Sequence, residues 1–166
     1  MGTRSSVIVL NENKDKIINL YRQFDGYPEG MGKDIFNVFG NIKLTNGFNS
    51  DQEQENCWAN GMEDLAEMVV CEIKNQCKTS TKFNSDTYEK KQDYDLLGIG
   101  NVYLYPVDFE NEQSYKYVIY PVDYEDENEY KKVYMSCTSS GEKEPMYDGP
   151  MSGFGDWLDS LKDEEQ

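Results

Sequence analysis

The chain contains no histidine, and its 32 acidic residues outnumber its 16 basic residues. Histidine is the side chain that most often moves protons near neutral pH, so its absence removes the commonest acid–base catalyst. The formal net charge is −16, which disfavours nucleic acid and anionic membranes as ligands of the acidic surface. We therefore expect no direct contact with nucleic acid and no membrane association.

Cysteine is also scarce, and the arrangement of the four cysteines matches no metal site. Cys57, Cys71, Cys77 and Cys137 include no C-x-x-C pair. They are too few for a secreted disulfide scaffold, and neither a signal peptide nor a membrane span is visible. A P-loop, a dinucleotide-binding fingerprint and a nucleophile elbow are all missing. We expect a reduced cytoplasmic protein without catalytic residues, metal or cofactor.

The 166 residues predict one domain with enough chain for a hydrophobic core. Apolar residues make up 37% of the chain, and thirteen tyrosines contribute to an aromatic content of 13%. The charge is unevenly distributed, because residues 108–166 hold 16 acidic and 5 basic residues. Any function that depends on negative charge therefore belongs to the C-terminal part of the chain.

A sequence repeat carries most of this charge. Residues 104–116 read LYPVDFENEQSYK, and residues 119–131 read IYPVDYEDENEYK. Each copy predicts a short apolar strand that ends in an acidic turn. Because like charges repel, the cluster suggests binding to a basic protein surface, including one that normally holds DNA or RNA. The alternative is a pair of solvated turns that keep the protein soluble. The carboxylates within 22 residues are Asp108, Glu110, Glu112, Asp123, Glu125, Asp126, Glu127 and Glu129, with Lys116 as the one lysine.

Hydrophobic periodicity predicts an α+β fold. Strands are expected at 5–10 and 17–24, which would form an N-terminal hairpin, and at about 99–107, 115–122 and 130–137, which would form a three-stranded meander. Helices are expected at 33–39 and about 58–77. The prediction is an antiparallel sheet of about five strands with these two helices on one face, followed by an amphipathic tail helix.

The composition changes after Cys137. Residues 138–153 are rich in glycine, serine and proline, which is typical of a linker between a domain of residues 1–137 and an acidic tail of residues 154–166. One helical face of the tail carries Phe154, Trp157, Leu158 and Leu161. We expect this face either to bind a partner groove or to fold back on its own sheet.

The N-terminal third contains a distinctive pair of segments, GTRS at 2–5 and YRQFDGYPEGMG at 21–32. They resemble a family of uncharacterised proteins, encoded by bacteriophages and some bacteria, with a GTR-[SG] strand and a Y-x-Q-[WFY]-D-G-Y-P-x-G-x-G segment. The resemblance implies a viral source and no particular reaction. The matching residues are Thr3, Arg4, Tyr21, Gln23, Phe24, Asp25, Gly26, Tyr27, Pro28, Gly30 and Gly32.

The same segments offer an alternative site for a small anion. Two guanidinium groups beside a glycine-rich turn can hold a phosphate or a carboxylate. The structural interpretation is that Asp25 pairs with an arginine and fixes the turn. The residues of this alternative site are Arg4, Arg22, Gln23, Asp25 and Tyr27.

Taken together, the sequence predicts a virus-encoded, acidic binding protein of the host cytoplasm. It would inhibit a host defence or nucleic-acid-processing protein without catalysis, by occupying a basic surface, including by DNA mimicry. The first alternative is a module that sequesters an anionic nucleotide signal. The second is a structural or virion-assembly protein. The sequence does not predict the oligomeric state.

Overall fold

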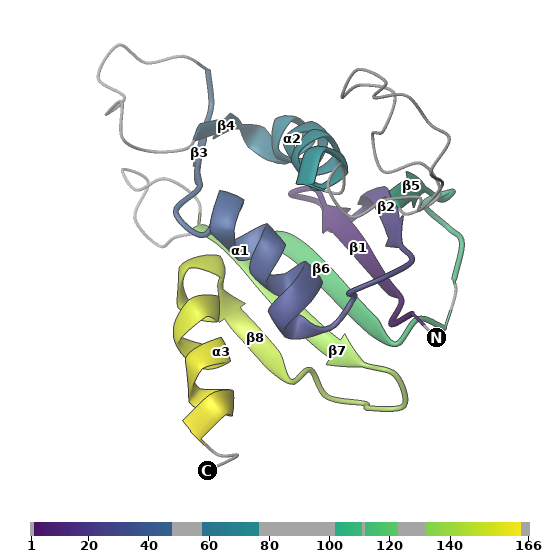
Figure 1. The fold of residues 1–166 in the computed structure, drawn as a ribbon. Helices are drawn as coiled ribbons and strands as arrows, with labels where there is room; N and C mark the ends of the chain where they lie inside the picture. The colour runs from purple at the N-terminus through teal and green to yellow at the C-terminus, as the bar shows by residue number, and fades with distance from the viewer. Residues whose placement is uncertain (1, 48–57, 77–101, 111, 123–131, 164–166) are drawn as a thin grey trace, which may run out of the picture.

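The computed structural model describes residues 2–47, 58–76, 102–110, 112–122 and 132–163. Within these residues the fold is α+β, with a mixed six-stranded sheet whose one face is covered by three α-helices (Figure 1). A second, two-stranded parallel sheet packs beside the longest helix and consists of β3 (Lys43–Thr45) and β4 (Trp58–Asn60).

The strand order of the large sheet is β5-β2-β1-β6-β7-β8. The pairing of β1 with β6 is parallel, and every other neighbouring pair is antiparallel. The sheet is therefore mixed, and the expected purely antiparallel sheet is wrong in this respect. The strands are β1 (Ser5–Leu10), β2 (Lys16–Arg22), β5 (Val102–Leu104), β6 (Tyr115–Val122), β7 (Lys132–Ser139) and β8 (Tyr147–Pro150).

The N-terminal hairpin is confirmed. β1 and β2 pair from Ser5↔Arg22 to Leu10↔Lys16, with an irregularity after Val9. The side chain of Asn11 organises the turn, because its Oδ1 accepts backbone N–H bonds from Asn13 at 3.0 Å and Asp15 at 2.9 Å. Such local side-chain hydrogen bonds are the reason that asparagine favours turns.

The two predicted helices are also confirmed, as α1 (Lys33–Phe39) and α2 (Gly61–Gln76). A short π-helical turn, η1 (Pro28–Gly32), leads into α1. The apolar side chains of α2 recur at helical spacing, so they form one stripe, and this stripe faces the core. The buried residues of this stripe are Met62, Leu65, Ala66, Val69 and Ile73.

The predicted C-terminal meander is wrong. β6 and β7 pair as expected, but β5 lies at the opposite edge of the sheet, where Tyr103 pairs with Tyr21 of β2. β5 is antiparallel to β2, and β2 is antiparallel to β1, so β5 runs in the same direction as β1 and β6. Strands that run in the same direction cannot be joined by a hairpin, and the chain must return along the sheet between them.

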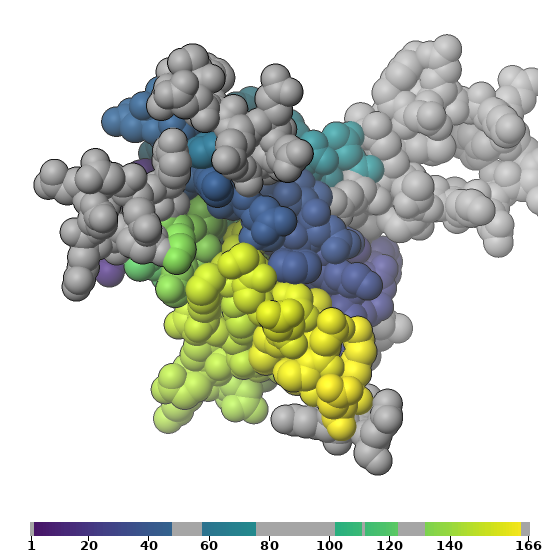
Figure 2. Space-filling model, turned by 90° about the vertical axis from the view of Figure 1, so that its left-hand side faces the viewer, coloured from purple at the N-terminus to yellow at the C-terminus, as the bar shows by residue number. Residues whose placement is uncertain are grey.

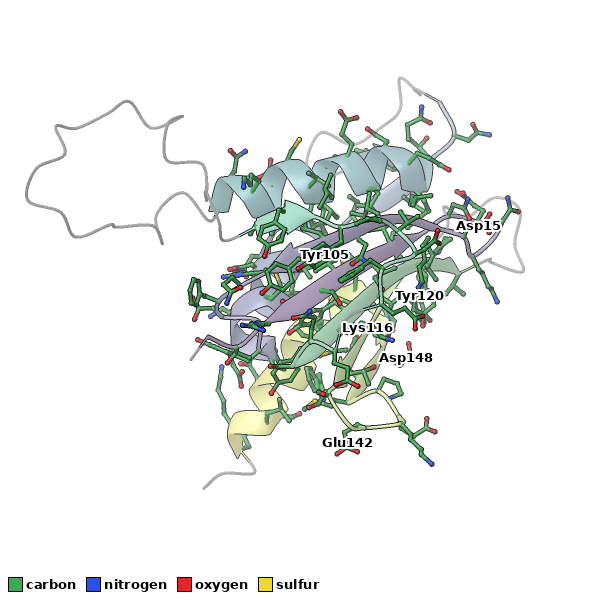
Figure 3. All side chains as sticks on the ribbon, turned by 90° about the vertical axis from the view of Figure 1, so that its right-hand side faces the viewer. Asp15, Tyr105, Lys116, Tyr120, Glu142 and Asp148 are labelled. Atoms are coloured by element: carbon green, nitrogen blue, oxygen red, sulfur yellow. The ribbon has the colours of Figure 1, made fainter. Side chains whose placement is uncertain are left out.

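Residues 105–110 and 112–114, called here the crossover, make this return on the face opposite the helices. We call that side the open face (Figure 3). The crossover explains why β1 is buried on both sides: Val7 and Val9 face the helices, whereas Ser6 and Ile8 on the open face are each only 8% exposed. A strand covered on both faces reads as a continuous apolar run, as SSVIVL does.

The predicted linker over 138–153 is wrong, because this segment is part of the sheet. β7 extends to Ser139, and β8 pairs with it through Met135↔Gly149 and Cys137↔Tyr147. A 3₁₀ turn, η4 (Met151–Gly153), follows directly, and Met151 is only 1% exposed. Glycine, serine and proline here form a turn and a short edge strand, where these residues are tolerated.

The apolar face of the tail packs on its own protein. α3 (Phe154–Asp163) lies against α1 and the β7–β8 side of the sheet (Figure 2). Phe154 and Leu158 are buried, and Trp157 and Leu161 pack against the core from partly buried positions. The interpretation of this face as an exposed partner-binding anchor is therefore wrong, and the alternative that it folds back is correct.

Removing the ring of Phe154 is expected to destabilise the whole domain. Phe154 is fully buried, and its ring lies 5.1 Å from the Tyr147 ring and 5.0 Å from the Trp157 ring. We expect Phe154→Ala to lower the free energy of unfolding by about 3–5 kcal/mol, measured by urea denaturation. The exposed Asp163→Ala on the same helix is the control, with an expected change below about 0.5 kcal/mol. Wild-type stability of Phe154→Ala would mean that α3 is not docked.

Candidate binding surface

The arginines of the N-terminal segments are not both available to a ligand. Arg22 is 6% exposed, and its guanidinium donates to Asp34 Oδ2 at 2.5 Å and to the Phe24 carbonyl at 2.8 Å. Arg4 is exposed. The sequence predicted that Asp25 pairs with an arginine, and this prediction names the wrong carboxylate. Asp34 of α1 is the residue that neutralises Arg22. Arg22 therefore connects β2 to α1 instead of facing solvent.

The other residues of the alternative site have separate roles. Gln23 Oε1 accepts a hydrogen bond from the Tyr21 hydroxyl, while Asp25 and Tyr27 are exposed. Asp25 has a φ of 54°, a left-handed conformation that non-glycine residues seldom adopt. Its carbonyl accepts the Met31 N–H at 2.8 Å, which holds the turn against η1.

Two glycines of this segment are required by close packing. A Cβ on Gly30 would lie 2.2 Å from the Asp25 carbonyl oxygen, and a Cβ on Gly32 would lie 2.6 Å from the Phe154 ring. Both distances are far below a normal carbon contact. The glycine-rich turn thus makes room for its own backbone and for α3, and its glycines have a structural explanation without a bound phosphate.

The described acidic residues of the first repeat copy are all exposed. Asp108, Glu110 and Glu112 lie on the crossover, and the Glu110 side chain is 89% exposed. Lys16 Nζ lies 3.9 Å from Glu110 Oε1, a distance at which a solvated pair contributes little stability. These carboxylates are therefore open to a partner. The predicted residues Asp123, Glu125, Asp126, Glu127 and Glu129 lie outside the described residues.

One acidic segment follows β5 and the other follows β6. Both segments begin at the same end of the sheet. β5 and β6 run in the same direction, so Leu104 and Val122 both end their strands toward the hairpin turn that carries Glu12 and Asp15. Asp15 is labelled at this end in Figure 3. The predicted meander would have placed its two turns at opposite ends. Lys14 and Lys16 also lie at this end and offset part of its charge.

Asn19 anchors the crossover to β2, a role that the sequence analysis missed. It is 3% exposed, and its side-chain Nδ2 donates to the carbonyls of Phe109 at 2.9 Å and Pro106 at 3.3 Å. Its backbone carbonyl accepts the Tyr105 N–H at 2.8 Å. The available signal in the sequence was a polar residue inside the apolar run IINLY at the centre of β2. Buried polar groups need such partners, so Asn19 fixes the position of the crossover.

An aromatic cluster lies beside this anchor on the open face. The Tyr21 ring is 4.7 Å from the Tyr103 ring and 5.2 Å from the Tyr105 ring, and the Tyr105 ring is 4.7 Å from the Phe109 ring. Tyr21 is buried, while Tyr103 and Phe109 are 40% and 44% exposed. Tyr103 and Tyr105 lie two positions apart and share this face, where both rings contact Tyr21.

A second group of side chains lies across β6, β7 and β8 on the same face. The Tyr120 hydroxyl donates to Asp148 Oδ1, and the Tyr120 ring is 5.9 Å from the Tyr134 ring. Burial, and then the hydrogen bond to Asp148, raise the pKa of Tyr120, so its hydroxyl remains protonated at physiological pH. Lys116 is exposed nearer the start of β6 (Figure 3). This group joins three strands and offers no nucleophile.

Within the described residues, no group of three or more histidine, cysteine, aspartate or glutamate side chains could hold a metal ion. Across the same part of the chain, no helix is both long enough and apolar enough to span a bilayer. Comparison of the chain with protein-family models, with curated proteins and with solved structures gives no match. The resemblance to phage proteins therefore remains a prediction.

Removal of the Asn19 side chain is expected to loosen the crossover. Asn19→Ala removes the donor of the Phe109 carbonyl and one of the two donors of the Pro106 carbonyl, at a cost of about 1–3 kcal/mol in the free energy of unfolding. Urea denaturation measures this cost, and faster exchange of the Tyr105 amide would locate it. Asn13→Ala, on the exposed hairpin turn, is the control. If both variants unfold alike, Asn19 does not anchor the crossover.

The cysteines are expected to differ in reactivity. Burial raises the pKa of the Cys137 thiol to about 12, and the residue is fully buried against Tyr117, whereas Cys71 is exposed. Because the thiolate is the reactive form, iodoacetamide at pH 8 should alkylate Cys71 in the native protein and Cys137 only after denaturation. Peptide mass spectrometry measures both. Alkylation of Cys137 at the rate of Cys71 would contradict its burial.

Proposed function

We propose that the protein is a virus-encoded binding protein that acts in the host cytoplasm without catalysis. It occupies a basic surface of a host defence or nucleic-acid-processing protein. The binding surface is the end of the sheet where β5 and β6 finish, beside the hairpin turn with Glu12 and Asp15; we call it the acidic end. The observation that carries this proposal is the common direction of β5 and β6. Because the two strands run the same way, both acidic segments begin at one end of the sheet, where they can contact one partner.

The spacing at this end supports competition with nucleic acid. The crossover is anchored on β2, which lies two strands from β6. Two strand spacings are about 10 Å. That separation is of the same order as the roughly 12 Å width of the DNA major groove. Two acidic segments that begin this far apart can engage a basic groove that normally receives two lines of phosphates.

The charge also supports fast and salt-dependent association. Exposed carboxylates attract a cationic partner over distances of about a Debye length, which is roughly 8 Å at physiological ionic strength. Self-repulsion among these groups costs stability in the free protein. A basic partner relieves that repulsion, so binding gains from the same charges that weaken the isolated fold.

The alternative nucleotide-binding function has less support. It requires Arg4 and Arg22 to hold one anion, but the guanidinium of Arg22 is buried and paired with Asp34. Opening this site for a ligand would expose the connection between β2 and α1. An unpaired buried charge is costly, which disfavours that rearrangement.

Neutralising either acidic segment is expected to weaken binding to the same partner. A pull-down from host lysate at low and high ionic strength first identifies a basic protein that is released by salt. Its affinity should then fall about tenfold for Glu125→Gln/Asp126→Asn/Glu127→Gln, and it should also fall for Asp108→Asn/Glu110→Gln. Isothermal titration calorimetry measures both affinities.

The matched control removes three charges elsewhere. Glu63→Gln/Glu67→Gln/Glu72→Gln changes one helix, α2, by the same net charge. If this control weakens binding as much as the triple variant at 125–127, only total charge matters and the proposed acidic end is wrong. If all three variants keep wild-type affinity, charge does not drive the interaction.

A further inference from the structure

Exposed apolar side chains of the described residues are concentrated on β5 and on the start of the crossover. Six large apolar residues are exposed in the described part of the chain, and Tyr103, Leu104 and Phe109 are three of them. Strand alternation places Tyr103 on the open face with Tyr105, whose ring lies 5.4 Å from the Tyr103 ring. Tyr103, Tyr105 and Phe109 therefore form one surface, called here the aromatic edge.

The aromatic edge is held rigidly. Its rings rest on Tyr21, which is 3% exposed, and the crossover that carries Phe109 is fixed by the hydrogen bonds of Asn19. Rigid aromatic side chains supply contact area at a low cost in conformational entropy. A surface that is already ordered in the free protein loses little on binding. These properties are typical of the anchoring residues of protein interfaces.

The neighbouring charges define the chemistry of the occupant. Asp108 and Glu110 flank Phe109 in the sequence, and all three residues are exposed. Lysine and arginine can lay their aliphatic stems on such rings while their charged heads meet the carboxylates. Phosphate backbones and anionic lipid would be repelled by the same carboxylates.

We infer that the aromatic edge is the apolar anchor of the partner-binding surface. Its occupant is a segment of a partner protein that alternates arginine or lysine with an apolar side chain. The inference rests on the proposed function and adds to it, because the face of α3 that the sequence offered as the anchor packs against its own protein. The aromatic edge provides the anchoring that α3 does not.

Two synthetic peptides of equal length and charge test this inference by fluorescence anisotropy. One alternates arginine with leucine, and the other alternates arginine with serine. We expect wild-type protein to bind the arginine–leucine peptide about tenfold more tightly, since one leucine is buried against the rings. Phe109→Ser should bring this ratio close to one. High salt should weaken both peptides and leave their ratio unchanged.

Met146→Ser is the matched control, because Met146 is 43% exposed but lies in the turn between β7 and β8, away from β5. It should keep the wild-type ratio. Tyr103→Ser removes a ring from β5 instead of from the crossover, and it should lower the ratio as Phe109→Ser does. Thermal melts followed by circular dichroism verify that the variants are folded.

The outcomes separate the two proposals. Equal binding of both peptides by wild-type protein would overturn the aromatic edge and leave the acidic end supported. An unchanged ratio in folded Phe109→Ser and Tyr103→Ser would overturn it as well. Binding of neither peptide would overturn the proposed function together with this inference.

Discussion

The parallel pairing of β1 with β6 is the constraint on which the rest of the structure depends. Val7 pairs with Tyr117 and Val9 with Ile119, and both partners of each pair are buried under the helices. This pairing gives β6 the direction of β1 and β5. The chain must therefore return across the open face before β6 begins. That return buries the second face of β1, positions the aromatic rings over β2 and starts both acidic segments at one end.

Much of this arrangement was not predictable from local sequence. The hairpin, α1 and α2 follow from short-range patterns: β-branched runs, a turn asparagine and an apolar stripe at helical spacing. The pairing of β1 with residues more than a hundred positions later leaves no such pattern. The sequence repeat led to the prediction of a meander, because two similar strands followed by similar turns are expected to be neighbours in a sheet. In the structure, similar strands occupy an edge and the interior of the sheet.

The candidate site shows the same division between local and long-range information. The exposure of Asp108, Glu110 and Glu112 agrees with the sequence analysis, since charged residues after a strand remain solvated. The prediction of a linker at residues 138–153 was wrong because it rested on composition. Glycine and serine are common in edge strands and at close contacts as well as in linkers. Arg22 and Phe154 were candidates for contact with a ligand or a partner, yet they pack with Asp34 and Tyr147 of their own chain. Amphipathic or charged side chains do not show by themselves whether their partner is internal.

Nuclear Overhauser effects between backbone protons of β1 and β6 test the central claim most directly. We expect contacts between residues 5–9 and 115–119 in the order of a parallel ladder, together with contacts between Tyr21 and Tyr103. Contacts between residues 102–104 and 115–122 in antiparallel order would instead establish the meander. That result would place the two acidic segments at opposite ends of the sheet and contradict the proposed binding surface.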